Sequence, residues 1–107
     1  MESRQYPRFA VLFAGTLVHH NRTHAITKSV DLSRKGCRLK STLCVIAGMS
    51  VDLLLYMPGE EIPLLVQGAT VRWAGARGIG LEFQALASHH QARLDSVIRR
   101  LEIEAYN

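Results

Sequence analysis

The fold of this chain is decided by a short stretch of sequence, Asp31-Leu32-Ser33-Arg34-Lys35-Gly36-Cys37-Arg38-Leu39. It begins with D-x-S-x-x-G, in which the side-chain oxygens of Asp31 and Ser33 favour a turn because they bond to nearby backbone groups. Gly36 permits a backbone angle that other residues avoid, or a close approach by another group. Alternating apolar residues then follow, so the stretch predicts a turn that leads into a strand over Cys37–Lys40.

Two arginines upstream, Arg4 and Arg8, form an R-x-x-x-R pattern. Their planar guanidinium groups suit phosphate oxygens and the N7/O6 edge of guanine. Asp31 complements them, because a carboxylate can accept hydrogen bonds from the N–H groups on the other edge of guanine. Together these side chains match a small anionic guanine nucleotide. Taken without the D-x-S-x-x-G motif, Arg4 and Arg8 would be better interpreted as solvated surface charges.

The rest of the chain alternates with a period of two and then changes period. The alternation predicts strands at Phe9–Val18, His24–Val30, Cys37–Lys40, Val51–Tyr56, Ile62–Trp73 and Ile79–Phe83. From Ser88 the period becomes about 3.6, with Gln91 placed to complete a capping box and an apolar stripe at Leu94, Val97, Ile98, Leu101 and Ala105. This predicts a helix over about 88–105.

The element order predicts a mainly all-β fold, a six-stranded antiparallel β-barrel with a C-terminal α-helix. A chain of 107 residues suits one domain. We expect the barrel and its helix to occupy residues 9–107. Residues 1–8 are expected to be a flexible segment that carries the R-x-x-x-R pattern.

Composition limits the partners and the compartment. With 13 basic and 9 acidic residues the net charge is +4, which favours anionic partners without naming one. The two cysteines, Cys37 and Cys44, are expected to be reduced, because no signal peptide precedes them. Both are also interpreted as small buried apolar residues. No apolar run approaches the ~18 residues that span a bilayer, so we expect a cytoplasmic protein without a membrane span.

No catalytic pattern stands out, so the protein is not expected to be an enzyme or to carry a cofactor. The sequence has no nucleophile–base spacing and no phosphate-binding G-x-x-x-x-G-K-[ST] motif. His19, His20 and His24 could in principle bind zinc. Adjacent histidines in a strand point to opposite faces, however, and a solvated loop is the better interpretation, as it is for His89 and His90.

The combination of R-x-x-x-R with D-x-S-x-x-G some twenty residues later resembles the PilZ domain family of bacterial cyclic di-GMP receptors. The resemblance implies a PilZ-type barrel in which Arg4 and Arg8 contact phosphates and guanine, and Asp31 accepts from guanine. It also implies that Ser33 adds a hydroxyl contact and that Gly36 keeps the backbone clear of the ligand. Trp73 lies where some members place a stacking residue, although a core or rim aromatic is as good an interpretation. Many relatives have a doubled arginine where this chain has Ser3-Arg4.

The function that the resemblance implies is a cyclic di-GMP receptor that signals to a protein partner through a change at its surface. The pattern starts three residues from Met1, with no upstream domain to reorient, so we expect the ligand to order residues 1–8. One alternative is a protein-binding adaptor that does not bind nucleotide. A small nucleic-acid-binding barrel is another alternative, but nucleic acid is not expected because Phe9, Phe13 and Phe83 look like core residues rather than a stacking platform.

Overall fold

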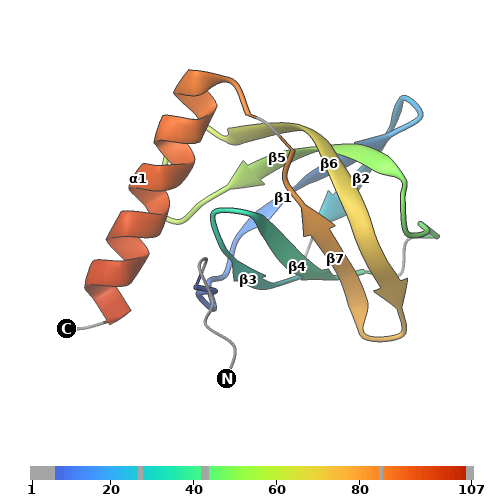
Figure 1. Cartoon of the computed structure of the whole chain (residues 1–107), viewed down its shortest axis with the longest axis horizontal. Coiled ribbons are helices and arrows are strands. Elements are labelled where there is room, and N and C mark those ends of the chain that lie inside the picture. Colours follow the sequence, from blue (N-terminus) through green and yellow to red (C-terminus); the bar gives the residue numbers. More distant parts are fainter. Residues whose placement is uncertain (1–6, 27, 42–43, 85, 106–107) are drawn as a thin grey trace.

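A computed structural model describes residues 7–26, 28–41, 44–84 and 86–105, which form one antiparallel sheet and one helix (Figure 1). The seven strands are β1 (Ala14–His19), β2 (Arg22–Ile26), β3 (Lys28–Leu32), β4 (Gly36–Lys40), β5 (Ser50–Tyr56), β6 (Leu64–Gly75) and β7 (Gly78–Glu82). The helix α1 spans Ser88–Ala105. The predicted mainly-β fold with a C-terminal helix is therefore confirmed.

The predicted six-stranded closed barrel is wrong in two respects. The sheet has seven strands in the order β2-β1-β5-β6-β7-β4-β3, and within the described residues no ladder joins its edges, β2 and β3. The segment predicted as one strand over His24–Val30 contributes to both edges, because β2 pairs with β1 whereas β3 pairs with β4. Alternation predicts that a segment is extended, but it does not show that the segment changes partner partway along.

The two edges nevertheless lie close together where the chain passes from one to the other. Ile26 ends β2 and Lys28 begins β3, so their Cα atoms are separated by at most about 8 Å. The sheet is therefore strongly curved (Figure 1), and its inner face encloses the core.

The first strand also begins later than predicted. Ala14, not Phe9, starts β1, while Phe9 exchanges two backbone hydrogen bonds with Leu32 of 2.9 and 3.0 Å in an isolated bridge. A tight hairpin joins β1 to β2, and His20 and Asn21 have positive φ angles of 51° and 61° there. Phe9 is thus held beside β3, and this places Arg8 next to the D-x-S-x-x-G turn, whereas residues 1–6 of the predicted flexible segment lie outside the described residues.

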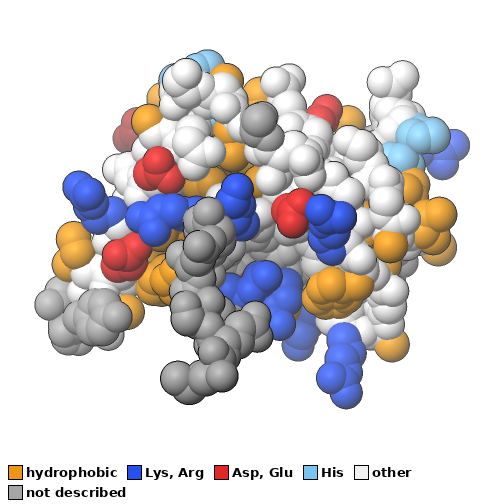
Figure 2. All heavy atoms as spheres, viewed as in Figure 1, with side chains coloured by type: hydrophobic (Ala, Val, Ile, Leu, Met, Phe, Trp, Pro, Cys, Tyr) orange, Lys and Arg blue, Asp and Glu red, His pale blue; other side chains and the backbone are white. Residues whose placement is uncertain are grey.

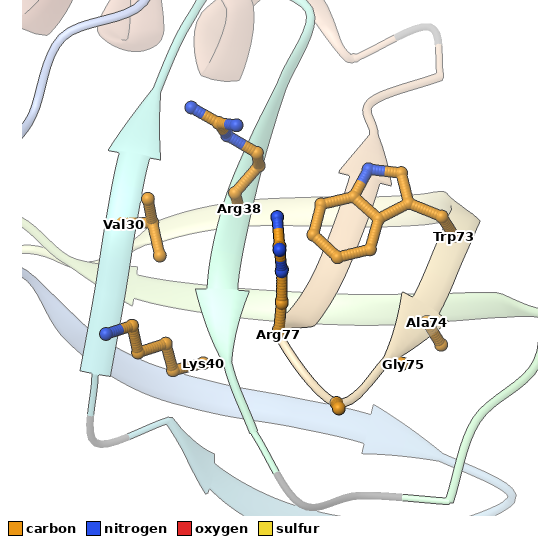
Figure 3. Close-up of a pocket in the computed structure, with 8 residues that line it drawn as sticks. Val30, Arg38, Lys40, Trp73, Ala74, Gly75 and Arg77 are labelled. Atoms are coloured by element: carbon orange, nitrogen blue, oxygen red, sulfur yellow. The ribbon is translucent and has the colours of Figure 1, made fainter.

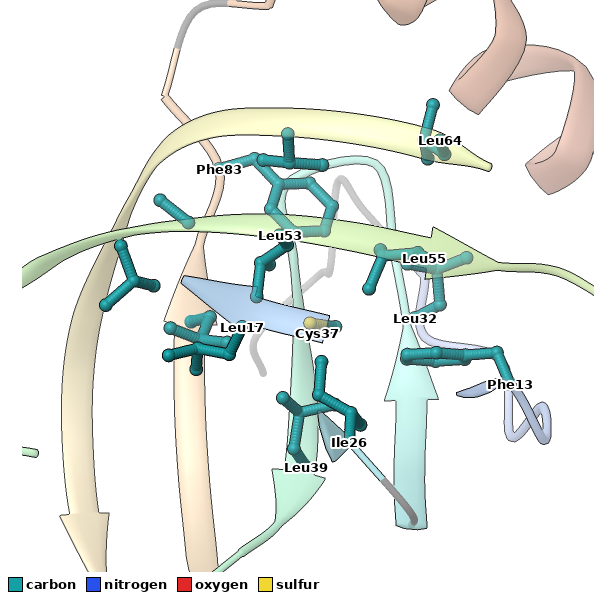
Figure 4. Packing of buried hydrophobic residues seen from close by; sticks show 14 of the residues in the cluster. Phe13, Leu17, Ile26, Leu32, Cys37, Leu39, Leu53, Leu55, Leu64 and Phe83 are labelled. Atoms are coloured by element: carbon teal, nitrogen blue, oxygen red, sulfur yellow. The ribbon is translucent and has the colours of Figure 1, made fainter. Parts of the chain in front are cut away.

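A single apolar cluster fills the curve of the sheet (Figure 4). Its fully buried leucines and valines come mainly from β5 and β6, and α1 adds Leu94, Val97 and Ile98. Phe13 and Phe83 are buried in this cluster and Phe9 packs partly against it, so none of the three forms an exposed stacking platform. The expectation that they belong to the core is confirmed.

Gln91 does not complete the predicted capping box with Ser88. Two arginines attach the helix to the rest of the protein. The amide of Gln91 donates to the carbonyl of Ala87, while its side chain donates to Asp95 at 3.0 Å instead of reaching back to Ser88. Arg93 donates to the carbonyl of Pro63 at 2.7 Å, and Arg100 donates to that of Pro58 at 2.7 Å. These bonds fasten α1 to the loop between β5 and β6.

The two cysteines differ in accessibility, and this contradicts the expectation that both are buried. Cys37 is fully buried on β4 and Cys44 is exposed. Burial raises the pKa of Cys37 to about 12, and the negative charge of Asp31 adds to the effect. Because the thiolate is the reactive form, Cys37 is protected by both its location and its protonation.

We expect one thiol to react rapidly with Ellman's reagent in the folded protein and the second to react only after unfolding. A Cys44→Ser variant should show no rapid reaction at mildly alkaline pH, where an ordinary thiol is largely ionised. Rapid reaction of both thiols in the folded wild-type protein would contradict this placement of Cys37.

Candidate functional site

The D-x-S-x-x-G turn is held together by Ser33. The Ser33 hydroxyl accepts from the amides of Lys35 at 3.1 Å and Gly36 at 3.2 Å, and it lies 3.3 Å from the Gly36 carbonyl, to which it donates. The residue is only 2% exposed. Its hydroxyl is therefore engaged within the turn, so the ligand contact expected of it would require some of these bonds to be broken.

Gly36 is needed because a neighbouring strand approaches its backbone. A Cβ atom at this position would lie 2.0 Å from the carbonyl oxygen of Leu81 in β7, well inside van der Waals contact. Gly36 pairs with Glu82 in the β4–β7 ladder, and its φ angle is not positive. The space left by the absent side chain is thus occupied by the chain's own backbone rather than kept open for a ligand.

Asp31 joins the two halves of the sequence pattern. It is 4% exposed, and its Oδ1 accepts from Nη1 of Arg8 at 3.2 Å across 23 positions of sequence. Its Oδ2 accepts from Arg38, through Nε at 2.8 Å and also through Nη2. One buried carboxylate therefore orients two arginines, and each of them keeps more than a third of its side chain accessible to solvent.

Arg38 was not among the residues predicted from the sequence. It faces Asp31 across the β3–β4 hairpin, as its direct register partner. Its pKa is raised, because its hydrogen bonds to Asp31 favour the charged form. A turn of known length between two strands fixes which residues oppose each other, so the spacing of Asp31 and Arg38 was the signal that could have identified it.

Trp73 is at the surface of the site and not in the core. Its side chain is 41% exposed, and its indole covers Gly80, since a Cβ there would lie 2.1 Å from the indole Nε1. Figure 3 shows Arg38 of β4, Arg77 of the β6–β7 turn and Trp73 of β6 around one open cleft of about 500 Å³. Lys40 and Val30 form the opposite side of this cleft.

A smaller pocket of about 110 Å³ connects this cleft to the turn. Arg8, Gly36, Arg38 and Trp73 all line it, so residues from three separate segments meet at one place. Arg72, which also lines it, is bound to Glu82 at 2.5 Å and lowers the pKa of that carboxyl group. Figure 2 shows Lys and Arg side chains in blue across this face of the molecule, with fewer acidic side chains among them. The site thus combines a flat aromatic with several cations, which suits an anionic ligand with a planar ring.

Arg34, in the middle of the turn, points to the helix instead. Its guanidinium lies 3.6 Å from Asp95 and 3.2 Å from Glu102 on α1. These are partly exposed pairs, so each contributes little to stability on its own. They nevertheless connect the turn that positions Asp31 to the C-terminal helix.

The remaining predictions concern residues and groups with no observed role at the site. Arg4 lies outside the described residues. Among the residues that the structure places, no cluster of three or more His, Cys, Asp or Glu side chains is arranged to hold a metal ion. In the same part of the chain, no helix combines the length and the apolar character needed to cross a membrane.

Comparison with known proteins agrees with this architecture. The family profile described as PilZ domain matches residues 2–100, nearly the whole sequence, so the chain belongs to the PilZ domain family. Domains of this family act as cyclic di-GMP receptors or as protein-binding adaptors, not as enzymes.

One similar solved structure is that of the inhibitor of motility MotI/DgrA from Bacillus subtilis. It superposes with a TM-score of 0.69 at 24% sequence identity, and the match covers 94% of this chain and 52% of that protein. This chain thus spans about half of that protein's length, and the likeness shows a shared fold. No curated protein sequence matches this chain.

Proposed function

We propose that this domain is a cytoplasmic receptor that binds cyclic di-GMP at the surface formed by Arg8, Arg38 and Trp73. The observation that carries the proposal is the contact of Arg8 and Arg38 with one buried carboxylate, Asp31, beside an exposed tryptophan. It brings together the two separate halves of the family's ligand pattern. Membership of the PilZ family supports the same conclusion.

The charges at the site favour a ligand with more than one negative charge. Arg8 and Arg38 share the single carboxylate of Asp31, so the three groups together carry a net positive charge. Lys40 and Arg77 add two more cations at the cleft next to Trp73. The two phosphates of cyclic di-GMP would be stabilised by these cations, while a guanine base stacks on the indole of Trp73.

The geometry assigns Asp31 a positioning role in addition to the guanine contact that the family resemblance implies. Both of its oxygens already accept from arginine, and little of the residue is accessible. A guanine edge could reach this carboxylate only if Arg8 or Arg38 moved away from it. In the proposed complex one arginine therefore turns to the ligand while the other stays on Asp31. Arg4 would add a further cation from the N-terminal segment.

The output of such a receptor is a change in its own surface that a partner protein recognises. Arg8 belongs to the segment that the ligand would hold against the sheet, and Arg34 links the adjacent turn to α1. Binding at the arginines would therefore alter both the N-terminal segment and the contacts of the helix.

Trp73 is the only tryptophan in the chain, so its fluorescence reports on this site alone. Titration with cyclic di-GMP should change the emission in a saturable way, because a base stacked on the indole excludes water and quenches it. Arg8→Ala should require at least about tenfold more nucleotide for the same change, as one charged hydrogen bond is lost.

Arg22→Ala is the matched control, because Arg22 is an exposed arginine at the β1–β2 hairpin. It should titrate like the wild-type protein. An emission spectrum of the wild-type protein that does not respond to cyclic di-GMP would contradict the placement of the nucleotide against Trp73. An equal loss in both arginine variants would show that only overall charge matters.

A further inference from the structure

A second surface, which is not lined by Arg8 or Trp73, has the features of a protein-docking site. A groove of about 570 Å³ runs between the segment before β1 and the end of β5, and its apolar lining includes Leu12, Tyr56, Met57 and Pro58. Leu12 is 80% exposed and Tyr56 is 47% exposed. Single exposed apolar residues are common, but here two large ones line the same groove and offer a partner more than one apolar contact.

Hydrogen bonds to the backbone on both sides of Leu12 hold this residue in its exposed position. The Ser29 hydroxyl donates to the carbonyl of Val11 at 2.6 Å and accepts from the amide of Phe13 at 3.1 Å. The backbone is thus held on both sides of Leu12, and the side chain of Phe13 is buried in the core. Leu12 is therefore directed outward by a specific pair of bonds, so a partner would meet a preorganised side chain and lose less entropy on binding.

Two lysines on adjacent strands lie opposite each other at the side of the groove. Lys28 of β3 and Lys40 of β4 are direct cross-strand partners, and both line the groove. Like charges directly opposite each other destabilise a sheet. Within the described part of the chain, neither lysine forms an ion pair or a side-chain hydrogen bond, although eight other ion pairs are present there.

We propose that this groove binds an acidic segment of a partner protein, with large apolar side chains that pack against Leu12 and Tyr56 and carboxylates that pair with Lys28 and Lys40. Charge complementarity selects this occupant over a neutral one, because carboxylates remove the repulsion between the two lysines. The groove is also close to the candidate nucleotide site, since Lys40 lines both. The inference identifies the partner side of the proposed receptor, but the docking itself does not require nucleotide.

The test uses the whole chain, isotope-labelled for NMR, and a short peptide of alternating glutamate and leucine as the probe, without nucleotide. The peptide should shift the amide resonances of Leu12, Lys28, Ser29 and Tyr56 in a saturable way. Lys28→Glu should weaken this binding by at least about tenfold, because it replaces attraction by repulsion. Leu12→Ser should weaken it while leaving the charge of the protein unchanged.

Matched controls separate the groove from general electrostatics. Arg22→Glu makes the same change of charge at an exposed site away from the groove and should bind the peptide like the wild-type protein. A counterpart peptide with lysine in place of glutamate should not bind. Because cyclic di-GMP is absent, failure here leaves the fluorescence titration at Trp73 as a separate result.

Three outcomes would overturn the proposal. The first is that the acidic apolar peptide shifts no resonance in the groove, or that it binds Lys28→Glu as tightly as it binds the wild-type protein. The second is that the resonances of Leu12 and Tyr56 change with protein concentration alone. This result would show that a second copy of the chain occupies the groove. The third is that the protein binds vesicles of anionic phospholipid, that Lys28→Glu abolishes this binding, and that the peptide shifts no resonance. This result would show that the groove binds a membrane surface.

Discussion

Arg38→Ala is expected to reduce the affinity for cyclic di-GMP by about ten- to a hundredfold, the equivalent of one charged hydrogen bond. Arg38 lies at the junction of both pockets at the site, where it approaches Trp73 on one side and Asp31 on the other. Its loss removes a cation from the ligand site. It also leaves Asp31, a buried carboxylate, with Arg8 as its remaining described partner.

The geometry of Arg38 predicts a graded response to substitution. Arg38→Lys keeps the charge but replaces the planar fork that contacts Asp31 through two nitrogen atoms. Lysine should therefore recover only part of the affinity that alanine loses. Calorimetric titration of the two variants beside Arg22→Ala measures this order. Wild-type affinity in Arg38→Ala would contradict the site, and full recovery with lysine would contradict the importance of the fork.

Gly36→Ala is expected to destabilise the folded protein by about 3 kcal/mol or more, because the added methyl group meets backbone and not a flexible side chain. The new Cβ would lie 2.0 Å from the carbonyl oxygen of Leu81 and 3.1 Å from its carbonyl carbon. Relief requires β4 and β7 to separate at the point where Gly36 pairs with Glu82. The same movement would displace the turn that Ser33 holds and the carboxylate of Asp31.

Gly75→Ala is the control for this substitution, since no atom beyond its own chain neighbours lies within 4 Å of a Cβ built at Gly75 and its φ angle is not positive. It should change stability by no more than about 0.5 kcal/mol. Urea denaturation followed by circular dichroism measures both variants. Equal, small effects in the two would show that the close approach of β7 to Gly36 does not constrain the fold.

The sequence was sufficient for the parts of the fold that local patterns determine. The change of period at Ser88 predicted the helix, and it begins and ends at about the expected residues. Oxygens on Asp31 and Ser33 predicted a turn, which Ser33 does form. The split of His24–Val30 into β2 and β3 could not be predicted in the same way, because it depends on strands distant in sequence.

The candidate site was predictable to a similar extent. Arg8 and Asp31 were identified from the motif, and they do meet. The roles expected for Ser33 and Gly36 came from the resemblance alone. In the structure Ser33 closes the turn, and the absence of a side chain at Gly36 allows the backbone of β7 to approach. Arg38 was missed because a motif specifies residue types at fixed positions in the sequence. The place of Arg38 at the site depends instead on its pairing with Asp31 across the hairpin.

Gly80 shows why contacts between strands are difficult to infer. In the sequence it is one small residue in an alternating strand, typical of an outward-facing position. In the structure it is the surface on which the indole of Trp73 lies, so the orientation of the tryptophan depends on a glycine in the adjacent strand. Its exposure shows that Trp73 is not a core residue, while its role as a stacking platform for a ligand stays a prediction.

The measurement that tests the central claim most directly is a calorimetric titration of the wild-type protein with cyclic di-GMP, with Arg8→Ala and Asp31→Ala titrated in parallel. Thermal denaturation of each variant would verify that it is folded before its binding is compared. We predict saturable binding by the wild-type protein and at least a tenfold loss, about 1.4 kcal/mol, in each variant. The absence of binding by the folded wild-type protein would contradict the receptor proposal and would favour an adaptor that acts through protein contacts alone.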